Sequence, residues 1–342
     1  MKLRRVCLVP KLSGVGGMVS FQERLAGGLV RRGIEACFDL ADKPYQAVLV
    51  IGGTRNLAGL LRAKRSGIPV VQRLDGMNWL HRLRRTGWRH YLRSEYGNFL
   101  LAFIRQRLAK RIVYQSTFSR QWWERCYGET RTPWQVVYNG VDLDVFSPVG
   151  PQDRPEGRWR ILLVEGNLSG GYESGLEMAV SLGENLRSDH GIQLEIVVVG
   201  GASAALQASW QGKTSFQLHF SGRVPPQSIP AIDRSAHLLY AADVNAACPN
   251  SVIEALACGL PVVSFDTGAL PELVQGEAGV IVPYGGDPWK LDAPDIDALA
   301  RAVVEVFHAQ ARYRLGARRR AEQAFGLDRM VEGYLRVLEG WD

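Results

Sequence analysis

The residues with the clearest chemical potential lie in one segment of the second half of the chain. Residues 248–263 read Cys-Pro-Asn-Ser-Val-Ile-Glu-Ala-Leu-Ala-Cys-Gly-Leu-Pro-Val-Val, which is a turn, a helical pattern and a Gly-containing stop. Pro249 ends any preceding helix, and Asn250 or Ser251 can cap the new one. The free N–H groups and the dipole at such a helix start would receive a diphosphate. Glu254 follows one turn later, on a face that could reach a ligand held at this helix start.

Short apolar runs alternate with segments of helical periodicity in both halves of the chain, and they predict the scaffold that positions this segment. Buried strands separated by helices indicate parallel sheets that are covered on both faces. Such sheets bind ligands outside the carboxyl ends of their strands. The predicted strands are residues 6–9, 47–51, 69–72, 111–114 and 136–142 in the first half, and 161–164, 194–199, 218–220, 238–241 and 261–264 in the second.

The chain has 342 residues, more than one hydrophobic core usually serves, and this length favours two domains. A polar stretch rich in proline and glycine follows Pro148, and we place the linker there. The prediction is an N-terminal Rossmann-like acceptor domain over residues 1–148 and a C-terminal Rossmann-like domain over 149–327. A final helix within 328–342 can pack back on the first domain. Two such domains facing each other would make a deep cleft.

The segment 248–263, with Asp-Thr-Gly at 266–268 and Pro-Glu-Leu at 271–273 after it, resembles the nucleotide-sugar site of glycosyltransferase family 4. This resemblance implies the GT-B fold, an α/β architecture of two facing Rossmann-like domains with doubly wound parallel sheets and an interdomain cleft. It also implies that Glu254 bonds the ribose hydroxyls. The backbone that would face the diphosphate belongs to Asn250, Ser251 and Val252. The residues alone leave open a second role for Glu254, a charge that complements the helix dipole.

Two motifs in the first half also resemble this family. Gly16-Gly17, after the first predicted strand, is similar to a turn that brings the backbone close to the donor phosphates and the acceptor. Asp75 ends a strand where the family often has a His or Asp near the sugar and acceptor. The resemblance therefore implies catalytic roles for Asp75 and Gly17 and a donor-binding role for Gly16. Glycine-rich turns and Asp-Gly turns also occur without any ligand, so a purely structural role stays open for both motifs.

The sequence departs from the family pattern at the first of two paired carboxylates. Members usually present Glu-x7-Glu, but the residue eight positions before Glu254 is Ala246. Asp243 and Asn245 are the nearest side chains that could contact the transferred sugar in its place. The departure leaves the donor sugar open. It also leaves an alternative function, a catalytically impaired protein that binds nucleotide sugar or acts as a partner protein.

A second departure follows the first strand of the C-terminal domain. Family members carry an Arg and a Lys there, which neutralise the diphosphate, but residues 165–173 contain neither cation and place Asn167 in this loop. Backbone N–H groups could do part of this work, and Arg223, Lys11 or Arg73 could supply the charge. The predicted donor-binding residues are Gly16, Asn167, Gly222, Arg223, Asn250, Ser251, Val252 and Glu254.

Charge is distributed unevenly between the two halves. Residues 1–150 hold 25 Lys and Arg against 10 Asp and Glu, while the remainder holds 16 against 24. A basic first half suits an anionic partner, which could be a phosphorylated acceptor, a membrane surface or a nucleic acid, although a solvated basic surface explains it as well. Residues 79–111 mix arginines with aromatic side chains, a composition that fits a membrane interface or an ordinary helix pair with a basic face.

The sequence offers no pattern for a metal site or a membrane span. Its five cysteines are scattered without a Cys-x2-Cys pair, and its six histidines show no His-x3-His spacing. No apolar run reaches 18 residues, and the apolar run near the start is too short for a signal peptide. We therefore expect no metal and no cofactor besides the donor substrate, in a cytoplasmic protein that could lie peripherally on the inner face of the membrane.

The resemblance thus implies a retaining, metal-independent glycosyltransferase that moves a sugar from a nucleoside-diphosphate sugar to a glycan, lipid-linked or small-molecule acceptor. Polysaccharide biosynthesis is the common setting of the family. Besides the impaired protein named above, two rival functions remain: a nucleotide-sugar epimerase of similar fold and a nucleic-acid binder. For the epimerase, the chain shows no obvious counterpart of the catalytic histidine and carboxylates that such an enzyme uses. The nucleic-acid binder depends on the basic first half alone, so we expect no nucleic-acid partner.

Overall fold

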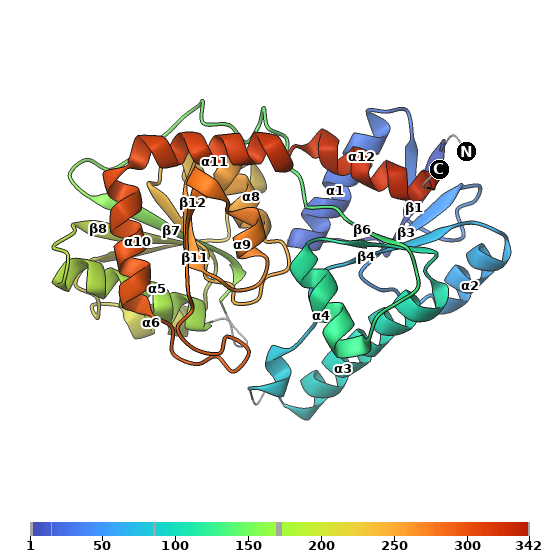
Figure 1. Cartoon of the computed structure of the whole chain (residues 1–342), viewed down its shortest axis with the longest axis horizontal. Coiled ribbons are helices and arrows are strands. Elements are labelled where there is room, and N and C mark those ends of the chain that lie inside the picture. Colours follow the sequence, from blue (N-terminus) through green and yellow to red (C-terminus); the bar gives the residue numbers. More distant parts are fainter. Residues whose placement is uncertain (1–2, 15, 85–86, 169–172, 341–342) are drawn as a thin grey trace. The chain divides into compact units, whose positions relative to one another are not determined.

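The computed structural model describes residues 3–14, 16–84, 87–168 and 173–340. Its contacts divide the chain into two compact units (Figure 1). Unit 1 contains residues 1–140 together with 326–342, and unit 2 contains residues 141–325. Each unit is described below by itself.

Unit 1 is built around a six-stranded parallel sheet in the order β2-β1-β3-β4-β5-β6. Its strands are β1 (Arg5–Val9), β2 (Glu35–Cys37), β3 (Ala47–Ile51), β4 (Val70–Leu74), β5 (Arg111–Tyr114) and β6 (Trp134–Val136). Its helices are α1 (Gly17–Val30), α2 (Leu57–Arg65), the short η1 (Leu80–Arg82), α3 (Trp88–Phe103), the π-helical η2 (Ile104–Leu108), α4 (Thr117–Tyr127) and α12 (Leu327–Glu339).

Alternate side chains of this sheet enter two cores. Leu8 and Leu49 pack with α1 and α12 on one face, whereas Cys7, Val48 and Val50 pack with α2 and α3 on the other. Both faces are therefore covered, which explains why β3 and β4 are buried at every position; β3 is apolar throughout, whereas β4 also buries Gln72 and Arg73.

The last helix of the chain completes the first core. Met330, Val331 and Tyr334 of α12 pack against α1, and Arg32, just after α1, forms an ion pair with Asp328 at 2.8 Å. The two helices approach so closely at Gly28 that a Cβ there would lie 2.4 Å from Cγ2 of Val331. The carboxyl-terminal helix therefore belongs to unit 1.

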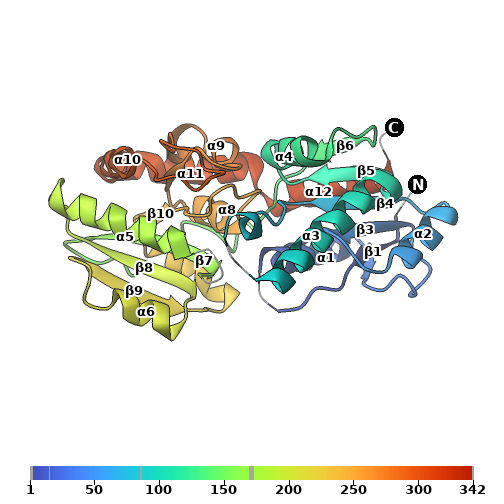
Figure 2. The same ribbon diagram turned by 90° about the horizontal axis from the view of Figure 1, so that it is seen from below.

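Unit 2 has a second six-stranded parallel sheet, in the order β12-β11-β10-β7-β8-β9; β10, β7, β8 and β9 can be followed in Figure 2. Its strands are β7 (Trp159–Asn167), β8 (Leu194–Gly201), β9 (Gln217–Gly222), β10 (Leu238–Tyr240), β11 (Val262–Phe265) and β12 (Gly279–Val282). Its helices are α5 (Glu173–Ser188), α6 (Ala204–Trp210), η3 (Pro226–Ser228), α7 (Ile229–Arg234), α8 (Asn250–Ala257), α9 (Leu270–Leu273), η4 (Gly276–Ala278), α10 (Ile296–His308) and α11 (Gln310–Ala324).

The observed elements differ from the predicted ones at the sheet edges. The strand expected at 136–142 instead occupies Trp134–Val136, and the segment after it places the side chain of Asn139 in hydrogen bonds with Arg73 and Gln115. The sequence analysis did not predict β2 and β12. Both are short edge strands, and β2 has only three residues, too few for a clear periodicity.

The boundary between the units also differs from the one placed after residue 148. The N–H group of Val141 donates to the carbonyl of Phe325 at 2.8 Å, and the guanidinium of Arg318 donates to the carbonyls of Leu143 and Phe146. These bonds attach residues 141–148 to the helices of unit 2.

Substitution of Gly28 tests the contact between α1 and α12. We expect Gly28→Ala to destabilise the protein by about 1 to 3 kcal/mol, because the added methyl group overlaps the stiff side chain of Val331. Gly27→Ala is the matched control on the same helix. It meets no atom within 4 Å, and it should stabilise the helix by roughly 0.5 to 1 kcal/mol.

Thermal and urea unfolding followed by circular dichroism would measure both variants. A loss of stability in Gly28→Ala together with a gain in Gly27→Ala supports the close packing of α1 on α12. Equal effects of the two substitutions would show that α12 does not depend on a close approach at Gly28.

Candidate functional site

The carboxyl edge of the unit 2 sheet collects most of the predicted donor-binding residues. Asn167 ends β7, Gly222 ends β9, and α8 begins after the loop that leaves β10. Because all the strands are parallel, these ends lie at one edge, where open α/β sheets bind ligands. The exposed side chain of Arg223 comes directly after β9 and has no ion-pair partner among the residues that the structure describes. Arg223 is therefore a cation available at this edge.

Helix α8 starts at Asn250, and its N-cap residue is Pro249. The expectation that Asn250 or Ser251 caps this helix is wrong, since both lie inside its first turn and no side chain accepts a capping hydrogen bond. A proline cap has no polar side chain to offer to the N–H groups. The start of α8 therefore keeps the partial positive charge of the helix dipole, which attracts an anion and which no capping side chain offsets.

The first-turn residues differ in what they can offer to a ligand. Asn250, Ser251 and Glu254 are partly buried, whereas the side chain of Val252 is fully buried in the core. Val252 can therefore contribute only its backbone. The carboxylate of Glu254 interacts electrostatically with Asp233, which is buried on α7, and helps to raise the pKa of Asp233, after burial as the main cause.

A β-bulge interrupts the pairing of β7 with β8 just before Asn167. Val164 pairs with Val199 and Asn167 pairs with Gly201, so β7 carries one residue more than its neighbour. Gly200 accommodates the bulge with a φ of +140°, and a Cβ there would lie 1.6 Å from the carbonyl oxygen of Glu165. Bulges of this kind re-aim side chains next to functional sites. Here the two β7 residues opposite Gly200 are Glu165 and Gly166.

Glu165 and Asp243 form an interacting pair of carboxyl groups at this edge. Glu165 lies near the end of β7, and Asp243 follows the neighbouring strand β10; the charge of Asp243 acts on the ionisation of Glu165. Burial raises the pKa of Asp243 to about 6, and burial together with the charge of Asp243 raises the pKa of Glu165 well above its usual range. At neutral pH the pair therefore favours retaining a proton. Sequence reasoning assigned no role to Glu165, because its proximity to Asp243 depends on how β7 and β10 lie in the folded sheet.

The loop between β10 and α8 contains Ala246, the position where the family pattern has its first carboxylate. Ala246 is buried, and its carbonyl accepts a hydrogen bond from the N–H of Ala269 at 2.8 Å. The preceding Asn245 has a φ of +62° and is buried, and its Nδ2 atom has no hydrogen-bond partner among the described residues. A buried amide without a partner is costly unless a ligand or water satisfies it. Asn245, directly before Ala246 in the chain, is thus a buried polar group that a ligand could satisfy.

The carboxyl edge of the unit 1 sheet holds the other predicted residues. Gly16 is the N-cap of α1 with a φ of +147°, and Gly17 is the first residue of this helix. The side chain of Gln22 fixes the loop before them, since it accepts from the N–H of Leu12 at 2.9 Å and donates to the carbonyl of Pro10 at 2.8 Å. A side chain at position 16 would be strained at this φ, which agrees with the glycine found there.

Asp75 follows β4 at the same edge. Its carbonyl accepts hydrogen bonds from Ser119 Oγ at 2.9 Å and Trp123 Nε1 at 2.7 Å, and its carboxylate is 26% exposed. Burial raises the pKa of Asp75, and the positive charge of Arg73 opposes the rise. The backbone is thus held by α4 while the carboxylate is left accessible.

Arg73 does not face solvent as the sequence analysis allowed. Its side chain is 1% exposed and lies over the ring of Phe21, with the guanidinium carbon 3.9 Å from the ring centroid. Its Nη2 atom donates to Asn139 at 3.1 Å, and its Nη1 atom lies 3.9 Å from a carboxylate oxygen of Asp75. The positive charge of Arg73 therefore acts on the carboxylate of Asp75 from the buried side. Arg73 is no candidate for direct contact with a diphosphate.

The described part of the chain contains no group of three His, Cys, Asp or Glu side chains placed to hold a metal ion. Within the same residues, no helix has the length and apolar character that crossing a membrane requires.

Two family models match the chain. The model described as Glycosyltransferase Family 4 matches residues 40–145, and the model described as Glycosyl transferases group 1 matches residues 160–309. A GDP-mannose-dependent alpha-(1-6)-phosphatidylinositol dimannoside mannosyltransferase of Mycobacterium tuberculosis is 27% identical over 234 residues, which are 66% of this chain and 57% of the relative. The chain spans about half the length of the curated relatives it matches.

Solved structures resemble the chain over nearly its whole length. Sucrose-phosphate synthase from Thermosynechococcus elongatus has a TM-score of 0.75 at 14% identity and covers 98% of both chains. HepE from Anabaena, solved in complex with UDP-glucose, has a TM-score of 0.71 at 16% identity and covers 99% of this chain and 100% of that one. These likenesses confirm the predicted GT-B fold. With a family model matched in each half and with this fold, the chain belongs to glycosyltransferase family 4.

Proposed function

We propose that this protein is a retaining, metal-independent glycosyltransferase that moves a sugar from a nucleoside-diphosphate sugar to an acceptor. The observation that carries the proposal is the first turn of α8, which has no capping side chain and presents Glu254 one turn later. A diphosphate suits the dipole and the backbone N–H groups at this helix start, and ribose hydroxyls can donate hydrogen bonds to the carboxylate of Glu254. No cofactor is required besides the donor itself.

The donor then makes most of its contacts with unit 2. Its diphosphate lies over the backbone of Asn250 and Ser251, with further N–H groups near Asn167 and Gly222. Arg223 supplies the positive charge that the loop after β7 lacks. Gly16 of unit 1 allows close approach of backbone to the phosphates. Each preorganised donor aimed at the leaving group contributes of order 3 kcal/mol to catalysis, so this set replaces the absent Arg and Lys at least in part.

The transferred sugar contacts the pair of Glu165 and Asp243. A carboxyl pair that shares one proton offers both a donor and acceptors to sugar hydroxyls. Burial of both groups and the unpartnered amide of Asn245 support a polar ligand at this position. The pair takes the place of the carboxylate that Ala246 lacks.

The acceptor approaches from unit 1. The anomeric configuration of the sugar is retained if the acceptor hydroxyl attacks the sugar on the same face from which the diphosphate departs. The departing phosphate then takes the proton of that hydroxyl. Asp75 orients the acceptor, and Arg73 beneath it favours the ionised carboxylate. The backbone at Gly17 lies at the start of α1 and borders the reacting groups. No protein nucleophile and no metal take part in this scheme.

The relatives support the type of substrate. One is named a GDP-mannose-dependent alpha-(1-6)-phosphatidylinositol dimannoside mannosyltransferase, and HepE was solved with UDP-glucose. We accordingly propose a nucleoside-diphosphate sugar as donor and a glycan or lipid-linked molecule as acceptor. We further propose that the protein acts in polysaccharide biosynthesis as a cytoplasmic protein with peripheral contact to the inner face of the membrane.

Thermal shift measurements test the donor site. UDP, GDP, ADP and their sugars are added without metal to the wild type and to Glu254→Ala. A ligand at 100 times its dissociation constant stabilises the folded protein by about 2.7 kcal/mol. We expect one nucleotide sugar to stabilise the wild type, and we expect Glu254→Ala to lose most of this shift because the ribose loses its partner.

Glu177→Ala serves as the control, since Glu177 is an exposed residue on α5 of the same unit. It should keep the full shift. The donor site proposed here is refuted if Glu254→Ala and Glu177→Ala respond alike. A normal shift without transfer or donor hydrolysis would instead favour the impaired, donor-binding protein.

The pH dependence of stability tests the carboxyl pair. In the folded state Asp243 has a pKa of about 6, against 3.8 in the absence of the fold. Ionised Asp243 therefore costs stability above about pH 6, and this cost vanishes below about pH 4, where both states are protonated. Asp243→Asn should stabilise the protein by about 1 to 3 kcal/mol at about pH 8 and have little effect at about pH 4.

Melting temperatures at both pH values would measure this difference. Asp144→Asn is a control on an exposed aspartate of unit 2 and should change little at either pH. A stabilisation by Asp243→Asn that is the same at both pH values would contradict the raised pKa.

A further inference from the structure

One side of helix α3 exposes a row of large apolar side chains. Trp88, Leu92, Tyr96 and Phe99 are 70%, 58%, 51% and 62% exposed. They are spaced three or four residues apart, so they lie on one side of the helix. We call these four residues the α3 stripe. Single exposed apolar residues are common, but a contiguous row marks a surface that binds something apolar.

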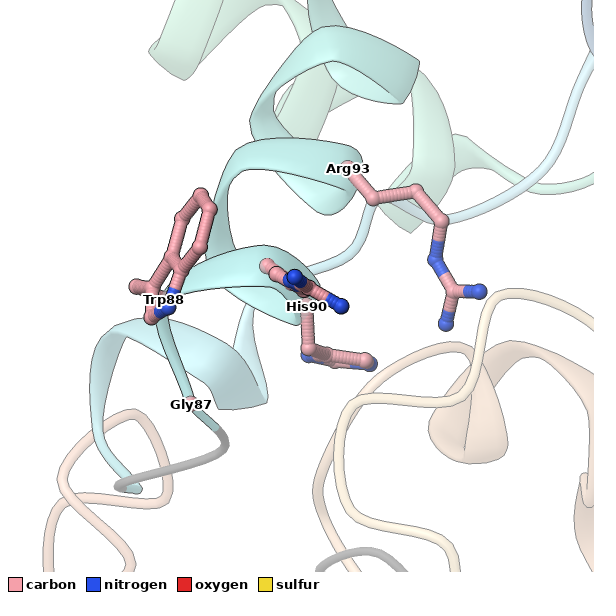
Figure 3. A pocket seen from close by; sticks show the side chains of 5 residues that line it. Gly87, Trp88, His90 and Arg93 are labelled. Atoms are coloured by element: carbon pink, nitrogen blue, oxygen red, sulfur yellow. The ribbon is translucent and has the colours of Figure 1, made fainter.

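Arginines flank the amino-terminal end of the α3 stripe. Arg89 and Arg93 are exposed, and the guanidinium carbon of Arg89 lies 5.4 Å from the centroid of the Trp88 ring. Together with Gly87 and His90, these three side chains line a hollow of about 500 Å³ (Figure 3). No acidic side chain is among the described residues that line it. The hollow thus combines an aromatic wall with two guanidinium groups.

The one acidic residue of α3 is neutralised by its neighbours. Glu95 accepts hydrogen bonds from Arg82 at 2.6 and 2.9 Å and contacts a ring nitrogen of His81 at 2.8 Å. The bonds from Arg82, opposed by partial burial and aided by His81, lower the pKa of Glu95 to about 2. Its negative charge is therefore compensated locally, and the surface around the α3 stripe remains cationic.

We propose that the α3 stripe docks on an anionic lipid bilayer, with Arg89, Arg93 and the hollow between them taking a lipid phosphate. This inference rests on the peripheral contact proposed above and names the surface that makes it. Tryptophan, tyrosine and arginine have an apolar body and a polar tip, and such side chains settle at the boundary between headgroups and acyl chains. The leucine and phenylalanine reach the acyl region beside them.

Charge complementarity favours a bilayer over a second copy of the chain. The α3 stripe of a second copy is apolar and offers these arginines no anionic partner, whereas an anionic leaflet attracts them. The helix would lie in the plane of the interface, as amphipathic helices with this composition do.

Sedimentation of the full-length protein with lipid vesicles tests the proposal. One vesicle preparation contains phosphatidylglycerol and phosphatidylcholine, and the other contains phosphatidylcholine alone. We expect the wild type to bind the anionic vesicles at least tenfold more tightly, because each basic residue near an anionic surface contributes roughly fivefold. Two double variants, Arg89→Glu with Arg93→Glu and Leu92→Ser with Phe99→Ser, should each weaken this binding at least tenfold.

The matched control is Arg62→Glu with Arg65→Glu, which makes the same change of net charge at exposed residues of α2. It should retain most of the binding. Equal loss in the α2 and α3 charge variants would overturn the proposal, since attraction would then depend on net charge alone. Wild-type protein that ignores anionic vesicles would overturn it too. A shift from dimer to monomer in the α3 variants, measured by light scattering with vesicle binding unchanged, would assign the surface to a second copy.

The donor-induced thermal shift, measured on the same variants, separates this inference from the proposed transferase function. Failure to bind vesicles with an intact donor shift defeats only the docking surface. Vesicle binding without any donor shift defeats only the donor site.

Discussion

A parallel β-sheet requires a crossover between each strand and the next, and this constraint governs both units of the protein. The crossovers here are helices that cover the two faces, so the strands are buried and all their carboxyl ends meet at one edge. Polar side chains at this edge lie next to the apolar core of the sheet. Asp75 in unit 1 and Glu165 with Asp243 in unit 2 owe their raised pKa values to this position.

The charges at these edges are balanced differently in the two units. In unit 1 the cation is buried: Arg73 contacts Phe21 and Asn139, and its charge acts on the nearby carboxylate of Asp75. In unit 2 the described edge lacks a buried cation near β7, and the positive potential comes from the uncapped start of α8 and from exposed Arg223. These charges agree with the proposal of an anionic ligand on unit 2 and of an ionisable carboxylate on unit 1 that orients the acceptor.

Much of this could be read from the sequence because it depends on local signals. The strand runs, the Pro249 stop and the spacing to Glu254 are encoded within short segments, and each has a direct physical meaning. Other features depend on contacts between distant residues. The bulge at Glu165 requires the register of β7 on β8, the burial of Arg73 requires Phe21 and Asn139, and the exposure of the α3 stripe requires knowing which side of α3 the core covers.

The central claim is that the first turn of α8 receives the diphosphate of the donor. Hydrogen–deuterium exchange of the backbone amides, measured with and without UDP-glucose or GDP-mannose, addresses this claim most directly. The account predicts that a bound donor slows exchange in a peptide covering residues 250–254 and leaves α2 of unit 1 unchanged. Saturating donor that leaves exchange at 250–254 unaltered while it protects another segment would contradict it.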